Sequence, residues 1–297
     1  MNVVYGHDWV FRYCMSLVDN AKKCYIVSNF YIVTEMISTV VKIEISTQGM
    51  LGDRFIGGIF RGWLGYVLKC DRKRSCAACD ESSNCPYFMV FKEKTGVRPY
   101  STLAFVDRDR VSGFIRLYGD KRRFAPKILS AIKMKEKKTH FGGLRYTIDS
   151  IEAKNQDIKT VELGSKLKIV TTSLMHLTRN KIFEVIPTFN TILRSSVRSY
   201  NRIAKYHDEK NYPYHVDNEI MNVDAEILDF DVHTIDHVHT TMNHKRLILS
   251  GIDGWITYDT SDMPEEVGKI LGMGEALQIG KHTAYGFGGF IALSQEE

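Results

Sequence analysis

The stretch GMGEALQIGKHTAYGFGGF, residues 272–290 of a 297-residue chain, gathers glycines around two basic residues. The glycines are Gly280, Gly286, Gly288 and Gly289, and they surround Lys281 and His282. Backbone N–H groups of such a loop can approach phosphate oxygens closely while a cation lies beside them. It is not the triphosphate-binding loop, since no GxxxxGK is followed by Ser or Thr, and it does not open a dinucleotide-binding βαβ unit. By spacing alone, the stretch also fits tight turns that pack a final strand.

Apolar residues make up 44% of the chain and charged residues 25%, with only 6 prolines. This composition is typical of a folded globular protein and excludes collagen-like, low-complexity and mostly disordered chains. At about 150 residues per domain, the length fits two domains. No apolar run approaches the roughly 20 residues that cross a bilayer, and the first residues do not look like a secretory signal. We therefore expect a cytoplasmic protein with no membrane partner.

Both halves of the chain show a similar predicted order of elements, strand and helix first, then two strands, a helix and a strand. In the first half they are residues 36–46, 56–68, 103–106, 113–118, 126–137 and 144–153, with one more strand-like piece at 88–92. In the second half they are residues 166–172, 183–206, 225–232, 245–249, 254–258, 265–271 and 289–293. This is the order of a ferredoxin-like unit, and the polar stretch 154–165 separates the two.

The predicted fold class is therefore α+β, with two tandem ferredoxin-like (RRM-type) domains. Residues 1–35 form an N-terminal extension of unknown role. Residues 36–162 form the first domain, with a cysteine-rich insertion at 70–87, and residues 163–297 form the second, with the C-terminal glycine-rich loop at 278–289.

The net charge is only +5, but the charges are distributed unevenly. Residues 121–138 contain many lysines and arginines and a single acid, Glu136, whereas residues 208–236 are rich in carboxylates. Arg194, Arg198 and Arg202 stand four apart and so share one face of the predicted helix. This pattern is typical of a protein that binds a polyanion, although each stripe alone could be a solvated helix face.

Four of the six cysteines fall close together, at Cys70, Cys76, Cys79 and Cys85. In a reducing compartment this clustering favours a metal over disulfides. Structural zinc held by all four thiolates is the first hypothesis, an iron–sulfur cluster the second and free thiols the third. Alternation along residues 231–239 would also put His233, His237 and His239 on one face of a strand, which fits either a metal site or a polar strand face.

Residues 271–290 resemble the glycine-rich loop of the CRISPR repeat-RNA processing endoribonucleases, members of the RAMP superfamily. That loop reads as two Gly-apolar-Gly groups joined by a short spacer. Gly280, Gly286, Phe287 and Gly288 match it, and Gln278 stands where the first glycine is expected. FRGWLG at 60–65, the cysteine segment 76–88 and the basic strand at 245–254 are similar to further parts of the family. These matches follow the family's order and span residues 36–292.

The resemblance implies binding of CRISPR repeat RNA and cleavage of one phosphodiester bond without a metal. In that reaction the ribose 2′-OH attacks phosphorus and leaves a 2′,3′-cyclic phosphate and a 5′-OH. The chemistry needs a base, an acid for the 5′-oxygen and cations for the phosphorane, and histidine can serve as base or acid near neutral pH. Many relatives carry such a histidine at the first helix, whereas this chain has none between Asp8 and Thr139.

The candidate catalytic residues are therefore His282 in the glycine-rich loop and His239 and Arg246 beside the basic strand. The candidate RNA-binding residues are basic side chains of the first helix, the two stripes and the loop, namely Arg54, Arg61, Lys69, Arg122, Arg123, Arg194, Arg198, Arg202 and Lys281. We expect no cofactor in catalysis.

Two other functions stay open beside the nuclease. One is a noncatalytic RAMP subunit that holds guide RNA in a CRISPR effector complex, which the missing first-domain histidine favours. The other is a zinc-stabilised binding protein unrelated to CRISPR. The two-domain layout with a cysteine insertion favours the nuclease, as a monomer or a homodimer. Cleavage of repeat RNA in EDTA separates the nuclease from the noncatalytic subunit, and a lack of affinity for repeat RNA would support the unrelated binding protein.

Overall fold

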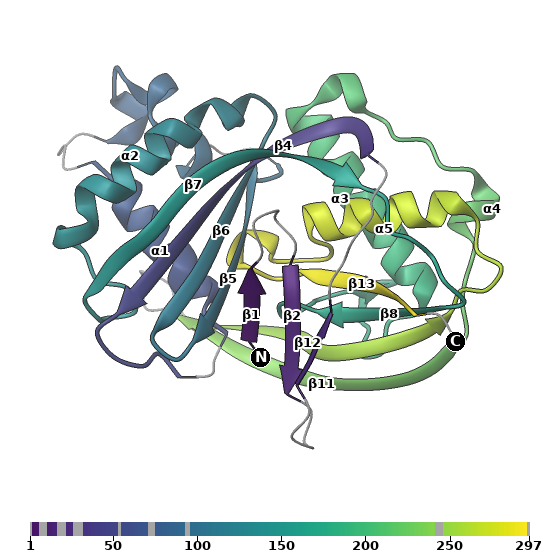
Figure 1. The fold of residues 1–297 in the computed structure, drawn as a ribbon. Helices are drawn as coiled ribbons and strands as arrows, with labels where there is room; N and C mark the ends of the chain where they lie inside the picture. The colour runs from purple at the N-terminus through teal and green to yellow at the C-terminus, as the bar shows by residue number, and fades with distance from the viewer. Residues whose placement is uncertain are drawn as a thin grey trace. The chain divides into compact units, whose positions relative to one another are not determined.

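The computed structural model describes residues 2–5, 11–16, 22–25, 32–52, 55–70, 75–92, 96–240 and 246–295 (Figure 1). Contacts divide the chain into two units, Met1–Tyr31 and Ile32–Glu297. The first unit contains a three-stranded antiparallel sheet of β1 (Asn2–Tyr5), β2 (Phe11–Ser16) and β3 (Lys22–Tyr25), in the order β1-β2-β3.

The second unit contains two antiparallel four-stranded sheets, each built from one half of it. The first half comprises β4 (Ile32–Thr47), α1 (Gly57–Leu68), β5 (Tyr100–Asp107), β6 (Arg110–Tyr118), α2 (Ala125–Lys135) and β7 (Tyr146–Lys159). The second half comprises β8 (Lys166–Thr171), α3 (Phe189–His207), β11 (Ile227–Thr240), β12 (Arg246–Asp259), α5 (Glu265–Leu277) and β13 (Phe290–Gln295). The strand orders are β5-β6-β4-β7 and β11-β12-β8-β13, so each half places its second strand beside its third, then its first and its fourth.

Short elements connect these strands and helices. They are η1 (Cys76–Ala78), η2 (Ser82–Asn84), η3 (Tyr87–Lys92), η4 (Gly119–Phe124), η5 (Glu136–Lys138), β9 (Thr178–Arg179), β10 (Ile182–Phe183), η6 (Glu209–Asn211), α4 (Asn218–Met221) and η7 (Thr283–Tyr285). No helix in the described ranges has both the length and the apolarity that a membrane crossing requires.

Each half buries its own apolar core, and a third cluster joins the halves. Phe60, Trp63 and Leu64 of α1 pack into the first core, while Ile192 and Leu193 of α3 pack into the second. The joining cluster is formed by Val97, Tyr118, Ile158, Tyr200, Ile203, Ala204, Met273 and Leu277. Because this cluster draws on the first sheet and on α3 and α5 of the second half, burial of its apolar surface holds the halves together.

The structure differs from the sequence prediction at η3 and at the start of α3. The piece predicted as a strand at 88–92 is a helical turn, η3, whose residues Tyr87, Val90 and Phe91 are buried at spacings of one and three residues. A short apolar run is ambiguous between strand and helix, which explains the error. Helix α3 begins at Phe189 rather than at 183, because Pro187 disfavours helix before it and the Thr188 side chain accepts the Thr191 N–H as the cap.

Helix α5 continues to Leu277, six residues beyond the predicted end at 271. Two glycines of this helix are needed because other parts of the chain lie too close to leave room for a Cβ. A Cβ on Gly272 would lie 1.7 Å from the Lys159 carbonyl oxygen, and one on Gly274 would lie 2.3 Å from the Ser196 hydroxyl. These two glycines therefore serve close packing, and the turns of the glycine-rich segment begin only after the helix.

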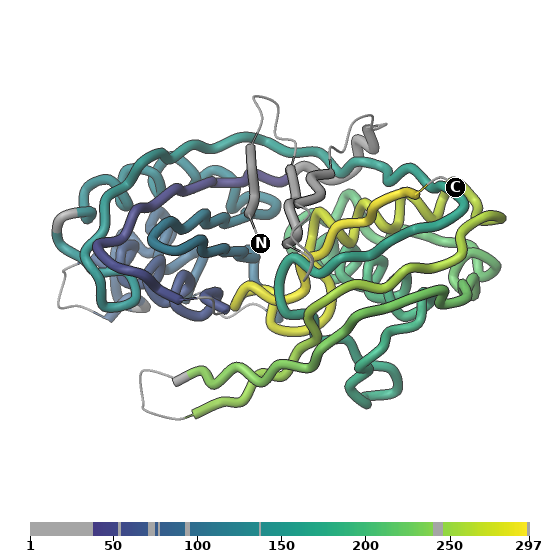
Figure 2. The backbone as a smooth tube through the Cα atoms, turned by 60° about the horizontal axis from the view of Figure 1, so that its bottom comes forward, coloured from purple at the N-terminus to yellow at the C-terminus, as the bar shows by residue number. Residues whose placement is uncertain are grey.

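The β11–β12 hairpin is longer than predicted and carries residues of the second half away from their own sheet. The strands pair from Ile227 opposite Tyr258 to Thr240 opposite Arg246. Figure 2 shows the hairpin running on past the rest of its sheet. Its far end reaches the first half, where the His237 ring meets the Phe55 ring edge-on at 5.0 Å between centroids.

Candidate functional site

The glycine-rich loop lies against the start of α1. Gly280, Gly286 and Gly288 have φ angles of 81°, 89° and 81°, a left-handed conformation that glycine adopts without strain. A Cβ on Gly57 would lie 2.1 Å from the Tyr285 carbonyl oxygen, so α1 must begin with a residue that lacks a side chain there. The loop and the helix therefore fit together only through these glycines.

Gln278 ties the loop to the first half. It is buried, and its side-chain nitrogen donates to the Thr102 carbonyl of β5 at 3.0 Å and to the Phe287 carbonyl of the loop at 2.7 Å. Its φ of 60° is the left-handed conformation, which explains why a glycine is expected at this position. The two hydrogen bonds of the Gln278 side chain offset the less favourable backbone conformation.

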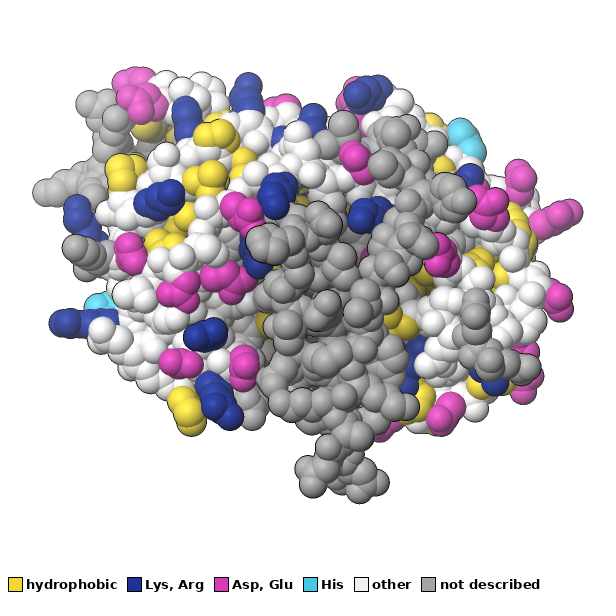
Figure 3. All heavy atoms as spheres, viewed as in Figure 1, with side chains coloured by type: hydrophobic (Ala, Val, Ile, Leu, Met, Phe, Trp, Pro, Cys, Tyr) yellow, Lys and Arg dark blue, Asp and Glu magenta, His cyan; other side chains and the backbone are white. Residues whose placement is uncertain are grey.

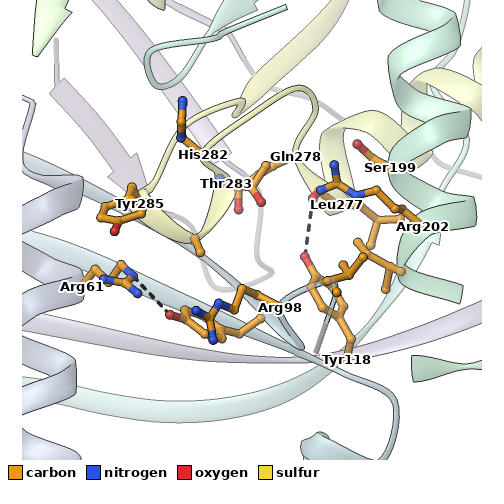
Figure 4. Close-up of a pocket in the computed structure, with 15 residues that line it drawn as sticks. Arg61, Arg98, Tyr118, Ser199, Arg202, Leu277, Gln278, His282, Thr283 and Tyr285 are labelled. Atoms are coloured by element: carbon orange, nitrogen blue, oxygen red, sulfur yellow. Dashed lines mark hydrogen bonds between the residues drawn. The ribbon is translucent and has the colours of Figure 1, made fainter. Parts of the chain in front are cut away.

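Arg61, His239 and Tyr285 meet at the start of α1, and we call these three residues the reacting cluster. The Arg61 guanidinium carbon lies 4.3 Å from the centre of the Tyr285 ring, and its Nε donates to the Tyr100 hydroxyl at 3.2 Å. The His239 ring meets the Tyr285 ring edge-on at 5.0 Å between centroids. Figure 4 shows Arg61 between Tyr285 and the hydrogen bond to Tyr100.

His239 reaches this cluster because the hairpin passes over a second glycine of α1. A Cβ on Gly58 would lie 3.1 Å from His239 Nδ1, closer than ordinary packing allows. In the hairpin His239 lies opposite Leu247, whereas Arg246 lies opposite Thr240. Adjacent residues of a strand point to opposite faces, so Arg246, opposite Thr240, lies on the face away from His239. The structure does not bring this predicted pair together.

The electrostatics of the cluster favour a neutral imidazole. Partial burial lowers the pKa of His239 below its ordinary 6.5, and the nearby positive charge of Arg61 lowers it further. Burial raises the pKa of Tyr100 above 10.0, and Arg61 partly offsets that rise through its charge and hydrogen bond. A neutral histidine at neutral pH can accept a proton directly.

His282, the other predicted catalytic histidine, lies on a different side of the loop. Its φ is 65°, and its ring meets His176 at 5.7 Å and Phe287 at 5.6 Å between centroids. Burial lowers its pKa, with smaller effects from His176 and Lys281. In Figure 4 its side chain points away from Arg61. His282 therefore has two ring neighbours that are not part of the reacting cluster.

A cavity of about 290 Å³ adjoins the reacting cluster between the two halves (Figure 4). Three arginines line it, Arg61 of α1, Arg98 before β5 and Arg202 of α3, and no Asp or Glu is among the described residues that line it. Tyr285 and His282 line it on the loop side. Two residues predicted to bind RNA, Arg61 and Arg202, thus meet at one place from opposite halves.

The remaining predicted RNA-binding residues lie apart from this cavity. Arg194 donates to the side chains of Asn190 and Asn222, both at 2.7 Å, so it braces the chain after α3. Arg198, Lys69 and Lys281 are exposed. Arg122 donates to the Gly119 carbonyl at 3.1 Å, and Arg123 lies 5.1 Å from the centre of the Phe124 ring. Arg54 lies outside the described residues. On the face in Figure 3, basic and acidic side chains are interspersed.

The four cysteines follow α1 on the chain, as predicted. Cys70 is exposed, and Cys76, Cys79 and Cys85 are half-buried. Within the described ranges, no group of three or more His, Cys, Asp or Glu side chains is placed to hold a metal ion. His233, His237 and His239 of β11 are among these residues, so they do not form such a group either. Zinc at the four cysteines stays a prediction.

Sequence reasoning missed Tyr285, Tyr100 and Arg98. Tyr285 sits inside the quoted glycine-rich stretch, so its position was available, but nothing in the spacing distinguished it from a packing residue. Arg98 precedes β5 and Tyr100 begins it. Only the fold reveals that this strand contacts α1.

Comparisons with known proteins give one family match and several matches of fold. Residues 167–290 match the family model of the CRISPR-associated endoribonuclease Cas6. No curated protein sequence matches the chain significantly. Among solved structures, a Cas6 product complex has a TM-score of 0.55 at 13% identity, covering 87% of this chain and 100% of its own. Thermus thermophilus Cas6 has a TM-score of 0.54 at 14% identity, covering 87% and 99%.

A partial Cas6-RT-Cas1–Cas2 complex has a TM-score of 0.55 at 9% identity, covering 89% of this chain and 47% of its own. At such identities, these likenesses show that the chain shares the Cas6 fold over most of its length. The family match covers the second half, including the hairpin that carries His239 and the loop that carries Tyr285. The chain therefore shares the Cas6 fold, and its residues 167–290 resemble the Cas6 endoribonuclease family.

Proposed function

We propose that the protein is an endoribonuclease of the Cas6 family, which cleaves CRISPR repeat RNA at the reacting cluster of Arg61, His239 and Tyr285, by attack of a ribose 2′-OH and without a metal. One observation carries the proposal. An imidazole with a lowered pKa, a guanidinium and a phenol meet at the edge of a cavity that three arginines line, with ring and cation contacts of 5.0 Å and 4.3 Å.

His239 is the base in this proposal. Its neutral ring takes the proton of the 2′-OH as the 2′-oxygen forms a bond to phosphorus. Arg61 cannot lose its proton in a protein, so it acts as a fixed cation for the negative charge that develops on the phosphorane oxygens. Its hydrogen bond to Tyr100 orients the guanidinium at the cavity edge.

Tyr285 is the acid. Its hydroxyl donates a proton to the departing 5′-oxygen while the bond from phosphorus to that oxygen breaks, which leaves a 2′,3′-cyclic phosphate and a 5′-OH. The imidazolium of His239 then returns a proton to the Tyr285 phenolate through solvent, which restores both groups. Arg61 lies over the Tyr285 ring, and its positive charge stabilises the transient phenolate.

The finer assignments of fold and partner also belong to this proposal. The two halves, each with four strands in the same order, are tandem ferredoxin-like domains of the RAMP type. The partner is CRISPR repeat RNA, bound by a monomer or a homodimer. The fold match to a Cas6-RT-Cas1–Cas2 complex supports a complex with other CRISPR proteins. Zinc at Cys70, Cys76, Cys79 and Cys85 stays a prediction that elemental analysis of the purified protein checks.

Cleavage of a panel of CRISPR repeat RNAs in EDTA tests the proposal. We expect His239→Ala to lower the single-turnover rate by ~100-fold or more, since proton transfer by a positioned residue contributes about that much. His233→Ala is the matched control, because His233 is an exposed residue of the same strand whose side chain pairs with Asp231 at 3.1 Å. Products should end in a cyclic phosphate. Tight RNA binding without cleavage by the wild type would instead indicate a noncatalytic guide-RNA subunit.

A further inference from the structure

The two groups that move protons in the proposed reaction belong to different segments, and a third segment joins these two. His239 belongs to the β11–β12 hairpin and Tyr285 to the glycine-rich loop. Residues 174–176 follow β8 and hydrogen-bond to both, so we call them the connecting segment. On the hairpin side, Met175 exchanges two backbone hydrogen bonds with Ile252 of β12, both at 2.9 Å. The connecting segment therefore runs alongside the hairpin as a further piece of strand.

The connecting segment also holds the glycine-rich loop. The carbonyl of Leu174 accepts the Gly288 N–H at 2.8 Å. The carbonyl of His176 accepts the Lys281 N–H at 3.1 Å. A Cβ on Gly280 would lie 2.3 Å from the same His176 carbonyl oxygen, so the loop approaches the segment more closely than a side chain would permit. Because closely packed chain transmits displacements, a shift between hairpin and segment also changes the distance between hairpin and loop.

The side chain of His176 adds a contact with the hairpin that the backbone of the segment does not make. Its Nδ1 donates to the Ser250 carbonyl of β12 at 2.7 Å. A carbonyl oxygen only accepts hydrogen bonds, so Nδ1 carries a proton whether the ring is neutral or charged. The ring also stacks on the Phe183 ring of β10, at 4.7 Å between centroids and 23° between planes. This stacking fixes the direction in which Nδ1 donates.

Ser250 links this contact to the base of the proposed reaction. It lies opposite Asp236 in the hairpin, and its hydroxyl donates to Asp236 Oδ1 at 2.5 Å. His239 follows three residues later on the same strand, where its ring meets the Tyr285 ring. The hydrogen bond of His176 therefore acts on the part of the hairpin that leads to the reacting cluster.

We propose that His176 is a positioning residue for RNA cleavage, whose imidazole fixes β12 against the glycine-rich loop and so holds His239 beside Arg61 and Tyr285. The inference rests on the proposed function, because it assumes that these three residues perform the chemistry. It gives His176 no part in proton transfer. Without the Nδ1 hydrogen bond the hairpin should shift away from α1, and the surroundings of His239 should report that shift.

Two substitutions separate the hydrogen bond of His176 from its packing. His176→Phe keeps a ring that stacks on Phe183 but removes the donor. His176→Asn loses the ring but carries an amide N–H group at the position of Nδ1, so it should restore the contact with Ser250. His207→Phe is the matched control, because half-buried His207 also donates from its ring to a backbone carbonyl, that of Val97 at 2.9 Å, outside the reacting cluster.

NMR titration of His239 in the full-length protein without RNA is the first readout, and it does not depend on activity. The ring signal is identified by its absence from the spectrum of His239→Ala. In the wild type the pKa of His239 should lie below 6.5, because partial burial and the charge of Arg61 lower it. In His176→Phe this pKa should rise toward 6.5, since both effects weaken when the hairpin leaves α1. His176→Asn and His207→Phe should keep the wild-type pKa.

Single-turnover cleavage of repeat RNA in EDTA, at saturating protein, is the second readout. His176→Phe should cut ~10-fold to 100-fold more slowly, because a displacement of about 1 Å at a catalytic group can cost that much. Its affinity for the RNA should stay that of the wild type, and His176→Asn should recover most of the rate. Circular dichroism and thermal unfolding show whether each variant folds. If His176→Phe does not, His176→Gln replaces it, since its amide lies one bond further from the backbone.

The two readouts distinguish failure of the inference from failure of the proposed function. An unchanged His239 pKa in His176→Phe, with cleavage by the wild type, would overturn the inference and leave the proposed function intact. So would a rise in both His176 variants, because the hydrogen bond would not be its cause, or a rise with no loss of rate. A rise confined to His176→Phe, in a protein that cuts no RNA, would support the hold of His176 on the hairpin and overturn the proposed function. A wild-type pKa of 6.5 or above would overturn both.

Discussion

The two halves of the second unit share a strand order but differ in what they contribute to the site. The first half supplies α1, which begins at Gly57 without a side-chain cap, and places Arg61 one turn further on. The second half supplies the β11–β12 hairpin with His239 and the glycine-rich loop with Tyr285. Its own first helix, α3, begins with a Thr188 cap instead.

This difference indicates how a repeated fold can hold an asymmetric site. Two glycines at the start of α1 leave room that the Tyr285 carbonyl and the His239 ring fill. A capped and side-chain-bearing start, as in α3, would exclude both. In the proposed mechanism, the first half is the platform with the cation, and the second half provides the groups that move protons.

The largest expected effect comes from the cation of the platform. Arg61→Gln should lower the cleavage rate by roughly 100-fold to 1000-fold, the range for removing one transition-state hydrogen-bond donor. It should also move the acidic limb of the pH–rate profile to higher pH. The charge of Arg61 lowers the pKa of His239, so its loss lets that pKa rise toward 6.5. Rates of the wild type and Arg61→Gln from pH 4 to 9 check both effects.

Arg61→Lys sharpens the same prediction, since it retains the charge but not the hydrogen-bonding fork. Its acidic limb should stay near that of the wild type while its rate falls. An unchanged limb in Arg61→Gln would show that His239 is not the group that titrates.

The next effect tests the open start of α1. Gly57→Ala would place a Cβ 2.1 Å from the Tyr285 carbonyl, so the loop must move away. A shift of this kind can cost on the order of 100-fold in rate, since catalytic geometry is sensitive to displacements of about 1 Å. Gly62→Ala is the control, because no atom lies within 4 Å of its added Cβ on the same helix. That control should keep the wild-type rate and gain slightly in helix stability.

Gln278 tests whether the two halves are tied through the loop. Gln278→Ala should lower the free energy of unfolding by about 3 kcal/mol, because it strips two buried carbonyls of their donor at a left-handed position. Gln278→Gly, with no backbone penalty, should lose about 1 kcal/mol less. Urea unfolding measures both. Equal losses in the two variants would mean that the backbone conformation costs nothing at this position.

The smallest effect concerns the second half alone. Burial raises the pKa of Glu275 from 4.5 to about 7, although its Oε1 accepts the Ala292 N–H. A carboxyl group with a raised pKa binds its proton more tightly in the folded state, so stability falls as pH rises from 4.5 to about 7 and is then constant. Glu275→Gln should remove this dependence and stabilise the protein by about 2 kcal/mol at pH 8. Unfolding at pH 5 and pH 8 checks the difference.

The sequence predicted the elements of both halves because their apolar residues recur at regular spacings, as in α1 and α3. It located His239, His282 and Arg61 by residue type. It could not predict that His239 and Tyr285 meet Arg61, since that depends on the length of a hairpin whose strands run on to Thr240 and Arg246. Nothing in the sequence distinguishes Gly57 and Gly58 of α1 from other glycines. Only the structure shows that the Tyr285 carbonyl and the His239 ring lie against them.

In the proposed mechanism, groups from the two halves act as one catalytic unit. Single-turnover cleavage of repeat RNA in EDTA by the wild type, His239→Ala, Arg61→Gln and the double variant tests it most directly. If the residues act together, the double variant should be little slower than the slower single variant, because residues of one unit are strongly non-additive. Losses that multiply, or a His239→Ala variant that cuts at the wild-type rate, would contradict the claim.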